Sequence, residues 1–399
     1  MPDRTAIKER LAAEIAARAD DLIATSHRIH EHPELNFEEK YAHDQLTALL
    51  EAGGMEVDRH AFGVDTAFVA RAGTEGPTIA VLCEYDALPG IGHACGHNII
   101  GTAGVGAGLA AAALADELGG RVVVVGTPAE EGGGGKIVLA ERGAFDGVDA
   151  AMMIHPAGAD LVRMDVIAVD QFTMSYEGEA AHAAAFPWKG RNALDAAVLG
   201  YMNVAALRQH IQPTERIHGI FTNGGDKPNI VPKFAETLWY VRSRTIASLD
   251  KLTPRVVAAL EAGAAATGCT CTRNRTAPVY ADMLDNPTMI ELYRANAVGT
   301  GRDPQDPAIS GTPVVGSTDM GNVSYLVPSI HPMIKVAPPH ISIHTPEFAE
   351  YAASPAGDAA VVDGATAMAQ TVADLWLDPA VLADAQRAFA AATGSTGPS

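Results

Sequence analysis

Cysteine is scarce in this chain: 399 residues include four, Cys83, Cys95, Cys269 and Cys271. Four unevenly spaced cysteines cannot form the disulfide framework of a secreted, disulfide-rich protein. Cys83 lies in an apolar run, and Cys269 and Cys271 alternate along a predicted strand, so these three are interpreted as ordinary unpaired thiols. The scarcity of cysteine favours a reducing compartment, and we therefore expect a cytoplasmic protein.

Blocks of lysine and arginine are also absent from the sequence. The chain carries 28 basic and 48 acidic side chains, which gives a formal net charge of -20. Because an acidic chain without a basic patch does not attract phosphate groups, we expect neither a nucleic acid nor an anionic membrane as a partner. The excess of acidic residues mainly serves solubility.

No hydrophobic run is long enough to indicate a membrane span. The longest weakly polar run, residues 99–115, consists mostly of glycine and alanine and is followed by Asp116 and Glu117. Its length and composition predict a buried helix that packs closely against a sheet. The N-terminal residues 1–21 lack the apolar core of an export signal, so export is not expected.

The hydrophobic residues that are present, 48% of the chain, can fill two cores and predict two domains. The pattern predicts two N-terminal helices, of which the second begins at Asn36 as N-cap and ends at Gly53 and Gly54. Helical patterns then alternate with short strands that are apolar on both faces, which indicates a mostly parallel sheet covered by helices. The predicted strands are residues 66–71, 78–84, 121–127 and 150–155.

The pattern changes in the middle of the chain. Strands at 167–176, 217–222, 235–242 and 269–275 alternate with helices at 192–208 and 249–266. This βαββαβ order is the ferredoxin-like arrangement. We therefore predict an α/β fold with three segments: residues 1–166 and 281–399 form the catalytic domain, and 167–280 form an inserted domain. Beyond Asp378, the alanine-rich end is expected to be a fraying tail.

The segment from Ile91 to Asn98 contains the pair Cys95 and His97 at the start of the buried helix. A thiolate and an imidazole two positions apart can bind one cation, because the intervening Gly96 lets the backbone fold tightly behind them. Alone, the pair is a weak signal. Further donors follow the carboxyl ends of predicted strands, where open α/β sheets build their sites, and another follows a strand near the end of the chain. These donors are Glu84, Asp86, Glu130, Glu131, His155 and His344.

Two adjacent glutamates suit the hydrolysis of an amide, which needs an activated water, a Lewis acid and a general base. One carboxylate of Glu130 and Glu131 can bind a metal ion while the other moves protons. The glycines at 132–135 allow a tight turn there, but the run lacks the Gly-Lys-Ser/Thr ending of a phosphate loop. The sequence thus indicates a metal-dependent hydrolase.

Plainer interpretations remain open for each of these residues. A single histidine such as His155 is commonly a core or surface residue, and the glutamate pair can be a solvated turn. Cys95 can be an inert buried thiol, although a helix N-terminus favours the thiolate. It can also be a covalent nucleophile with His97 as its base. A metal-bearing binding or regulatory protein of the same fold, without catalysis, is a further alternative.

These motifs resemble the dinuclear metallopeptidase and amidohydrolase family that includes aminoacylase, carboxypeptidase G and the indole-acetyl-amino-acid hydrolases. The resemblance extends from the stretch that begins at His32 to the region around His344, and its most specific motif is residues 93–97. It implies two divalent metal ions, with Cys95 able to bridge them, and a middle domain that acts as a lid and mediates homodimerisation. The mix of ligand types suits Zn, Mn or Co. The resemblance also implies the site residues: Cys95, His97, Glu131, His155 and His344 as metal ligands, Glu130 as general base, Asp86 as the aspartate that orients a ligand, and His182 and Asn229 as substrate-binding residues.

At two positions this chain differs from the indole-acetyl-amino-acid hydrolases, and these differences indicate which branch of the family it resembles. This chain has Asn98 where indole-acetyl-amino-acid hydrolases have aspartate, and Thr318 where they have glutamate. Both variants look like the branch of aminobenzoyl-glutamate hydrolase and dipeptidase-like amidohydrolases. The resemblance therefore implies cleavage of an amide bond in an N-acyl amino acid, an aminobenzoyl-glutamate-like compound or a dipeptide.

Overall fold

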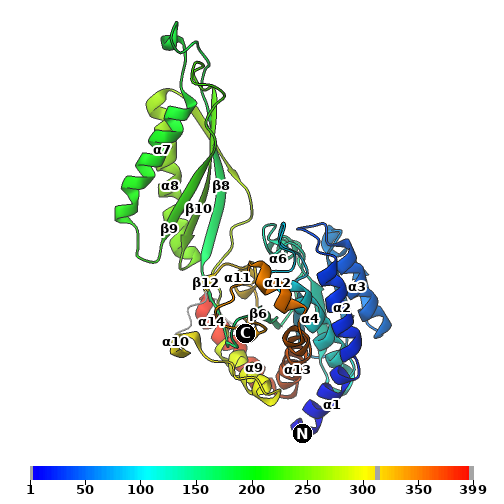
Figure 1. The fold of residues 1–399 in the computed structure, drawn as a ribbon. Helices are drawn as coiled ribbons and strands as arrows, with labels where there is room; N and C mark the ends of the chain where they lie inside the picture. Colours follow the sequence, from blue (N-terminus) through cyan, green and yellow to red (C-terminus); the bar gives the residue numbers. More distant parts are fainter. Residues whose placement is uncertain (1–2, 311–314, 395–399) are drawn as a thin grey trace. The chain divides into compact units, whose positions relative to one another are not determined.

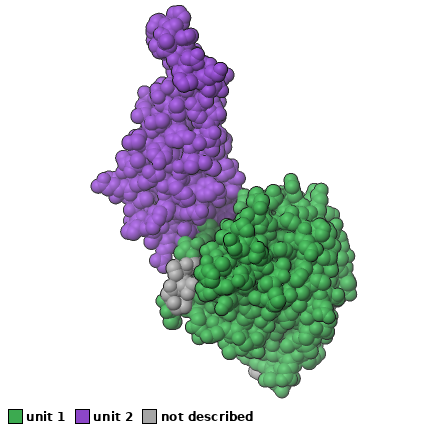
Figure 2. Space-filling model, in the orientation of Figure 1, with its two compact units in different colours: residues 1–165, 283–399 green, residues 166–282 purple. Residues whose placement is uncertain are grey.

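The computed structural model describes residues 3–310 and 315–394, and the chain divides into two compact units (Figures 1 and 2). Unit 1 comprises Met1–Asp165 and Met283–Ser399, and unit 2 comprises Val166–Asp282. Unit 2 is therefore an insertion into the sequence of unit 1. Among the described residues, no helix combines the length and the apolarity needed to cross a bilayer.

Unit 1 is built on a six-stranded sheet with the order β1-β2-β4-β3-β5-β13. Neighbouring strands from β4 to β13 are parallel, whereas β2 is antiparallel to both β1 and β4. The predicted α/β class with a mostly parallel sheet is confirmed. β1 was not predicted because its sequence holds a single apolar residue, Val57. The strands are β1 (Glu56–Arg59), β2 (Phe68–Ala72), β3 (Thr78–Cys83), β4 (Arg121–Gly126), β5 (Ala150–Met152) and β13 (Ser329–Ile330).

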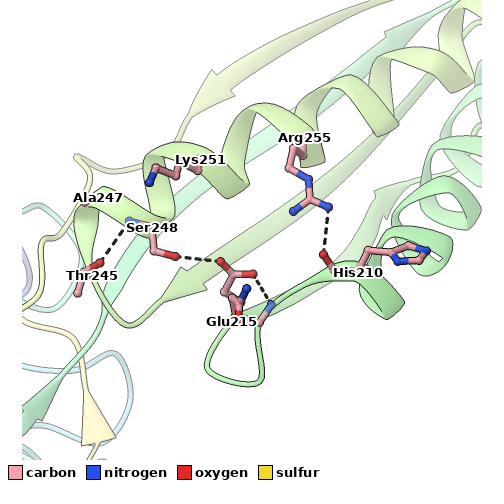
Figure 3. A pocket seen from close by; sticks show the side chains of 8 residues that line it. His210, Glu215, Thr245, Ala247, Ser248, Lys251 and Arg255 are labelled. Carbon is pink, nitrogen blue, oxygen red and sulfur yellow. Dashed lines mark hydrogen bonds between the residues drawn. The ribbon is translucent and has the colours of Figure 1, made fainter.

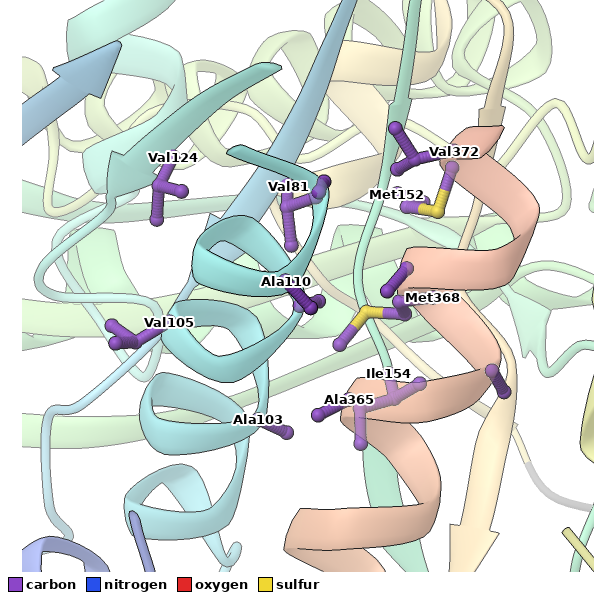
Figure 4. Packing of buried hydrophobic residues seen from close by; sticks show 14 of the residues in the cluster. Val81, Ala103, Val105, Ala110, Val124, Met152, Ile154, Ala365, Met368 and Val372 are labelled. Carbon is purple, nitrogen blue, oxygen red and sulfur yellow. The ribbon is translucent and has the colours of Figure 1, made fainter. Parts of the chain in front are cut away.

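Helices cover both faces of this sheet because its strands are apolar on both sides. Along β3, Ile79 and Val81 belong to one apolar cluster, and Leu82 belongs to the other. In Figure 4, side chains of α4 and α13 meet those of the strands on the first face. The apolar cluster that contains Ile79 and Val81 also takes residues from α1 (Arg4–Ala16), α2 (Ala19–Glu31), α3 (Lys40–Ala52), α4 (His97–Ala112), α9 (Pro287–Gly299), α13 (Pro355–Leu377) and α14 (Pro379–Thr393). The cluster on the other face, which contains Leu82, takes residues from α6 (Gly135–Glu141) and α11 (Met320–Ser324).

α4 is the buried, glycine-rich helix that the sequence predicted. A Cβ atom on Gly104 would lie 2.5 Å from the Sγ atom of Cys83, and one on Gly108 would lie 2.1 Å from Val124. Only glycine allows the helix to approach the sheet this closely, which compensates for its low helix propensity. The close approach fixes the N-terminus of α4, where Cys95 and His97 lie.

Unit 2 has the βαββαβ order of a ferredoxin-like domain, as predicted. Its antiparallel sheet has the strand order β11-β8-β10-β9, and α7 and α8 pack on it (Figure 1). Alternate residues of β10, such as Trp239 and Val241, are buried in the core beneath the two helices. The elements are β8 (Ala168–Glu177), α7 (Ala193–Leu207), β9 (Arg216–Asn223), β10 (Phe234–Ser243), α8 (Ile246–Thr267) and β11 (Thr270–Arg275).

Several local predictions were wrong. Three helices precede the first strand, and the N-cap of α3 is Glu39 instead of Asn36. The predicted strand 150–155 is two strands, because β6 (His155–Ala157) leaves the main sheet and pairs with β14 (Met333–Lys335). The predicted tail beyond Asp378 is the helix α14 up to Thr393, whose start the Asp378 side chain caps; residues 395–399 lie outside the described part. The remaining short elements are α5 (Ala115–Leu118), α10 (Pro307–Ser310), α12 (Pro346–Ala352), β7 (Asp165–Val166), β12 (Val315–Gly316) and the 3-10 helices η1 (Ala61–Gly63), η2 (Pro187–Lys189) and η3 (Arg208–His210).

Candidate metal centre and catalytic site

The five side chains expected to bind metal come from segments far apart in the sequence, all of them in unit 1. Cys95 and His97 lie at the N-terminus of α4, and Glu131 lies in the loop after β4. His155 begins β6, and His344 lies just before α12. Since β3, β4 and β5 are parallel, the loops after them meet at one edge of the sheet. The fold thus brings these segments to one place.

Their ligand atoms form two groups of three that share Cys95. The first group is Cys95, His97 and His155, and the second is Cys95, Glu131 and His344; within each, the atoms lie within 4.8 Å of one another. The Cys95 Sγ atom lies 3.4 Å from Nε2 of both His155 and His344. His344 Nε2 lies 3.2 Å from a Glu131 carboxylate oxygen.

The donors fit divalent ions. Nε2 of His97 and Oε1 of Glu131 are buried and form no hydrogen bond of normal geometry among the described residues, although Glu84 lies 3.4 Å from the first atom and His344 lies 3.2 Å from the second. Buried polar atoms normally have a partner, so their arrangement around the Cys95 thiol suits a cation. Thiolate, imidazole and carboxylate together are ligands that Zn, Mn and Co accept.

The imidazoles are held with Nε2 toward these groups. Nδ1 of His97 lies 3.0 Å from the Asp86 carboxylate, and Nδ1 of His155 lies 2.8 Å from the Pro156 carbonyl oxygen. Each contact engages Nδ1 and leaves Nε2 for the ligand role, as is usual at metal sites. Asp86 also accepts a hydrogen bond from the Glu131 amide at 3.0 Å. Burial lowers the pKa of His155 to about 4, so its imidazole is neutral, the form that binds metal.

The Cys95 thiol was expected to be favoured as a thiolate by its place at a helix N-terminus, and the structure differs on this point. Burial, followed by the negative charge of Glu131, raises the pKa of the Cys95 thiol well above its ordinary value. The N-terminus of α4 therefore does not by itself produce a thiolate, because desolvation outweighs the helix dipole. A nearby cation would favour the thiolate, whereas a nucleophilic cysteine without metal would need a lowered pKa.

Glu130 is 7% exposed and is absent from the two groups that share Cys95. Burial, followed by the charges of Glu84 and Glu131, raises the pKa of Glu130 well above its ordinary value. A third group of ligand atoms joins Glu84, His97 and Glu130 within 4.8 Å. Glu130 is thus a buried carboxyl beside the two groups, and the positive charge of bound cations would lower its pKa toward the ionised form that a general base needs.

A buried lysine that the sequence did not reveal lies next to these carboxylates. Lys136 Nζ donates to Glu84 at 2.5 Å and to Asp319 at 2.7 Å, and all three side chains are fully buried. Although burial lowers it, the pKa of Lys136 is raised above its ordinary value by Asp319 and Glu84. Lys136 is therefore a fixed positive charge that balances two buried acids. Glu84 and Asp319 lie in sequence motifs, whereas a lysine at the start of an apolar helix does not by itself indicate a functional residue.

Two further histidines are buried near the site and were not assigned a role. Neither ring nitrogen of His93 or His331 has a hydrogen-bond partner among the described residues. Burial lowers the pKa of each to about 3, so both rings are neutral. The His331 ring lies 5.4 Å from that of His155, and neither His93 nor His331 enters a three-residue ligand group within the described part of the chain. They pack as uncharged rings.

The predicted substrate-binding residues, His182 and Asn229, lie in unit 2 and are neighbours there. The Ala183 amide donates to the Asn229 carbonyl oxygen at 3.0 Å, and His182 pairs with Ile230 in an antiparallel bridge. Nδ1 of His182 accepts the Ala184 and Ala185 amides. Since Nδ1 accepts these hydrogen bonds, the ring carries its proton on Nε2, which makes His182 a hydrogen-bond donor there.

Unit 2 also contains a surface pocket of about 400 Å³ (Figure 3). Two of its charged groups contact the chain itself: Glu215 accepts hydrogen bonds from the Gln212 amide and the Ser248 hydroxyl, and Arg255 donates to the His210 carbonyl oxygen. These contacts join the start of α8 to the segment before β9. These polar residues are therefore explained by their role in holding unit 2 together, and we assign no ligand to the pocket.

Comparisons with known proteins agree with this geometry. A family model of peptidase family M20/M25/M40 matches residues 76–374, so the chain belongs to this family. It is a hydrolase of C–N amide bonds, and the resemblance found in the sequence is confirmed. A mouse (Mus musculus) Xaa-Arg dipeptidase is 41% identical over 400 residues, which cover 96% of this chain and 92% of that protein.

A second sequence relative and a solved structure are also similar to this chain. A p-aminobenzoyl-glutamate hydrolase polypeptide of Escherichia coli is 37% identical over 264 residues, or 61% of this chain and 55% of that protein. A dinuclear metal binding peptidase of the M20 family from Bacillus subtilis has a similar fold, with a TM-score of 0.68 and 21% identity. That match covers 90% of this chain and 99% of the other. The chain is thus a dipeptidase-like or amidohydrolase-like member of the family.

Proposed function

We propose that this protein hydrolyses dipeptides with two divalent ions and uses Glu130 as the general base. The observation that carries the proposal is the pair of ligand groups that share Cys95, with Glu130 beside them but in neither. In this assignment Cys95, His97 and His155 hold one ion, and Cys95, Glu131 and His344 hold the other. Bound there, the ions would lower the pKa of a water molecule and polarise the amide carbonyl.

The protein's own groups would then move the protons. Glu130 removes a proton from the attacking water and delivers it to the departing nitrogen, because it is a buried carboxyl outside both groups and directly precedes the proposed ligand Glu131. Asp86 keeps His97 in the tautomer whose Nε2 faces the site. His182, as an Nε2 donor, and Asn229 remain predicted substrate contacts.

The proposed substrate class is a dipeptide whose C-terminal residue is basic. The support is the 41% identity to Xaa-Arg dipeptidase over nearly the whole chain. The net charge of -20 also attracts a cationic substrate and repels an anionic one such as an aminobenzoyl-glutamate. We further propose a cytoplasmic location, since all four cysteines are unpaired.

The metal-loaded protein should hydrolyse dipeptides ending in Arg or Lys with kcat/KM at least about tenfold above those ending in Glu, a difference of about 1.4 kcal/mol. Initial rates over a panel of Xaa-Arg, Xaa-Lys and Xaa-Glu dipeptides, N-acetyl amino acids and p-aminobenzoyl-glutamate measure this. A preference for p-aminobenzoyl-glutamate would contradict the proposed substrate class. Tight binding without turnover across the panel would instead establish the alternative, a metal-bearing binding protein.

We also propose that the protein is a homodimer formed through unit 2. β9 is an edge strand of its sheet, and Ile220 on this strand is 62% exposed. On α7, Val198, Leu199 and Met202 are also exposed, with Met202 at 58%. An exposed edge strand with apolar side chains pairs readily with another strand, and pairing with its own copy gives a closed two-fold assembly.

Ile220→Glu should convert this dimer into a monomer at micromolar concentration, because two-fold pairing brings the new charges of both copies together. Light scattering after size exclusion should give twice the 41.5 kDa chain mass for the original protein and the chain mass for the variant. The control is Leu326→Glu, an exposed position in unit 1, which should leave the mass unchanged. A monomeric original protein would contradict the proposal.

A further inference from the structure

Glu39 is a fully buried carboxylate that lies outside the metal-binding groups. It is the N-cap residue of α3, yet its side chain makes no capping hydrogen bond. Instead, one of its oxygens, Oε1, accepts the backbone amides of Phe37 and Ala129, each at 2.9 Å. Ala129 lies 90 residues further along the chain, so the carboxylate joins two separate segments.

Both residues held by this oxygen have an unusual backbone conformation. Phe37 has φ +62° and Ala129 has φ +59°, the left-handed region that residues other than glycine rarely adopt. Such conformations persist where surrounding contacts impose them, and they concentrate at functional sites. Here the contact common to both is the Glu39 carboxylate.

Ala129 immediately precedes Glu130 and Glu131 in the loop after β4, and its conformation sets the direction in which the chain continues into these two residues. Its carbonyl oxygen accepts the amides of Gly133 and Gly135, at 3.0 and 3.4 Å, so it also closes the following loop. A rotation about Ala129 would therefore displace both glutamates together.

The segment around Glu39 holds the same loop at a second point. With its amide nitrogen toward Asp86, Asn36 donates to that carboxylate at 2.9 Å and accepts the Gly132 amide at 3.2 Å. The Phe37 ring, 39% exposed, lies against Gly133, where a Cβ atom would be 2.4 Å from it. Residues 36–39 thus contact the loop from 129 to 133 at three points, Ala129, Gly132 and Gly133.

We infer that Glu39 is a positioning residue: by accepting the Ala129 amide it fixes the left-handed turn that aims Glu130 and Glu131 into the site. The inference rests on the proposed roles of these two glutamates. It requires an acceptor oxygen at Oε1 and does not require a charge. Glutamine in place of Glu39 should therefore work, and alanine should not.

Glu39→Ala should lower kcat about 10- to 100-fold with little change in KM, because a displacement of about 1 Å in a catalytic group has effects of this size. Glu39→Gln should stay within about threefold of the original protein. The decisive variant is Glu39→Ala combined with Ala129→Gly, since glycine adopts a positive φ without help. It should recover about tenfold in kcat over Glu39→Ala alone, whereas adding Phe37→Gly should recover nothing.

Glu215→Ala is the matched control, because Glu215 is a buried glutamate of unit 2 that accepts a backbone amide and is not one of the proposed catalytic groups. It should lower the melting temperature without changing kcat. Equal losses in Glu39→Ala and Glu39→Gln, or a double variant no more active than Glu39→Ala, would overturn the inference.

Hydrogen exchange of the amides from 129 to 135, together with metal content, gives a readout independent of turnover. Exchange should accelerate in Glu39→Ala and remain slow in Glu39→Gln. If Glu130→Gln stays active, the proposed function fails while exchange still reports on Glu39. If Glu130→Gln is inactive but Glu39→Ala keeps full kcat and slow exchange, this inference alone fails.

Discussion

Glu130→Gln should lower kcat by about 10³-fold or more while the protein keeps its metal ions. The substitution retains the size of the side chain and removes the group that accepts and returns the proton, a contribution of about 10²- to 10⁴-fold for a general base. Metal content should not change because Glu130 is in neither group that shares Cys95. Elemental analysis and single-turnover rates on the same preparation measure both quantities.

Two further substitutions serve as controls for this prediction. Glu131→Gln should lose metal as well as activity, because Glu131 is one of the predicted ligands. Glu141→Gln, at an exposed position shortly after the site loop, should change neither. If Glu130→Gln retains turnover, another group is the base. If it loses metal, Glu130 is a ligand, as the third group of Glu84, His97 and Glu130 would allow.

Removal of the metal ions by a strong chelator should abolish activity, and Zn, Mn or Co should restore it. The apo protein should also be less stable, since an ion present at 100 times its dissociation constant stabilises the folded state by about 2.7 kcal/mol. Activity assays and thermal unfolding before chelation, after it and after metal addition measure these effects. Mg is the control, because a site with a thiolate and three imidazoles disfavours it.

The same experiment separates the metal mechanism from the cysteine nucleophile. The raised pKa of Cys95 predicts slow alkylation of the thiol, and bound metal should slow it further. Activity that resists the chelator but disappears when Cys95 is alkylated would establish the nucleophile and contradict the metal mechanism.

Much of the fold could be predicted because its strongest signals are local. Strands that are apolar on both faces, a glycine-rich buried helix and the βαββαβ order each follow from nearby residues. β1 and the break between β5 and β6 could not be predicted, because both depend on pairing with distant strands. The prediction of Asn36 as the N-cap of α3 was wrong for a different reason: the side-chain amide of Asn36 contacts Asp86 and Gly132 instead of the helix.

The candidate site was predictable to the extent that its residues lie in motifs or at strand ends. The structure brings the five predicted ligands into two adjoining groups, and it places His182 beside Asn229 in unit 2. Lys136 and Glu39 could not be recognised, because their importance comes from contacts with residues 52 to 183 positions away. The assigned roles of all these residues remain predictions.

Anomalous diffraction at the zinc edge, from crystals of the Glu130→Gln variant grown with zinc, tests the central claim most directly. We predict two peaks: one bound by Cys95, His97 and His155, and the other by Cys95, Glu131 and His344. A single peak, or an ion held by Glu84 and His97 without Cys95, would contradict it.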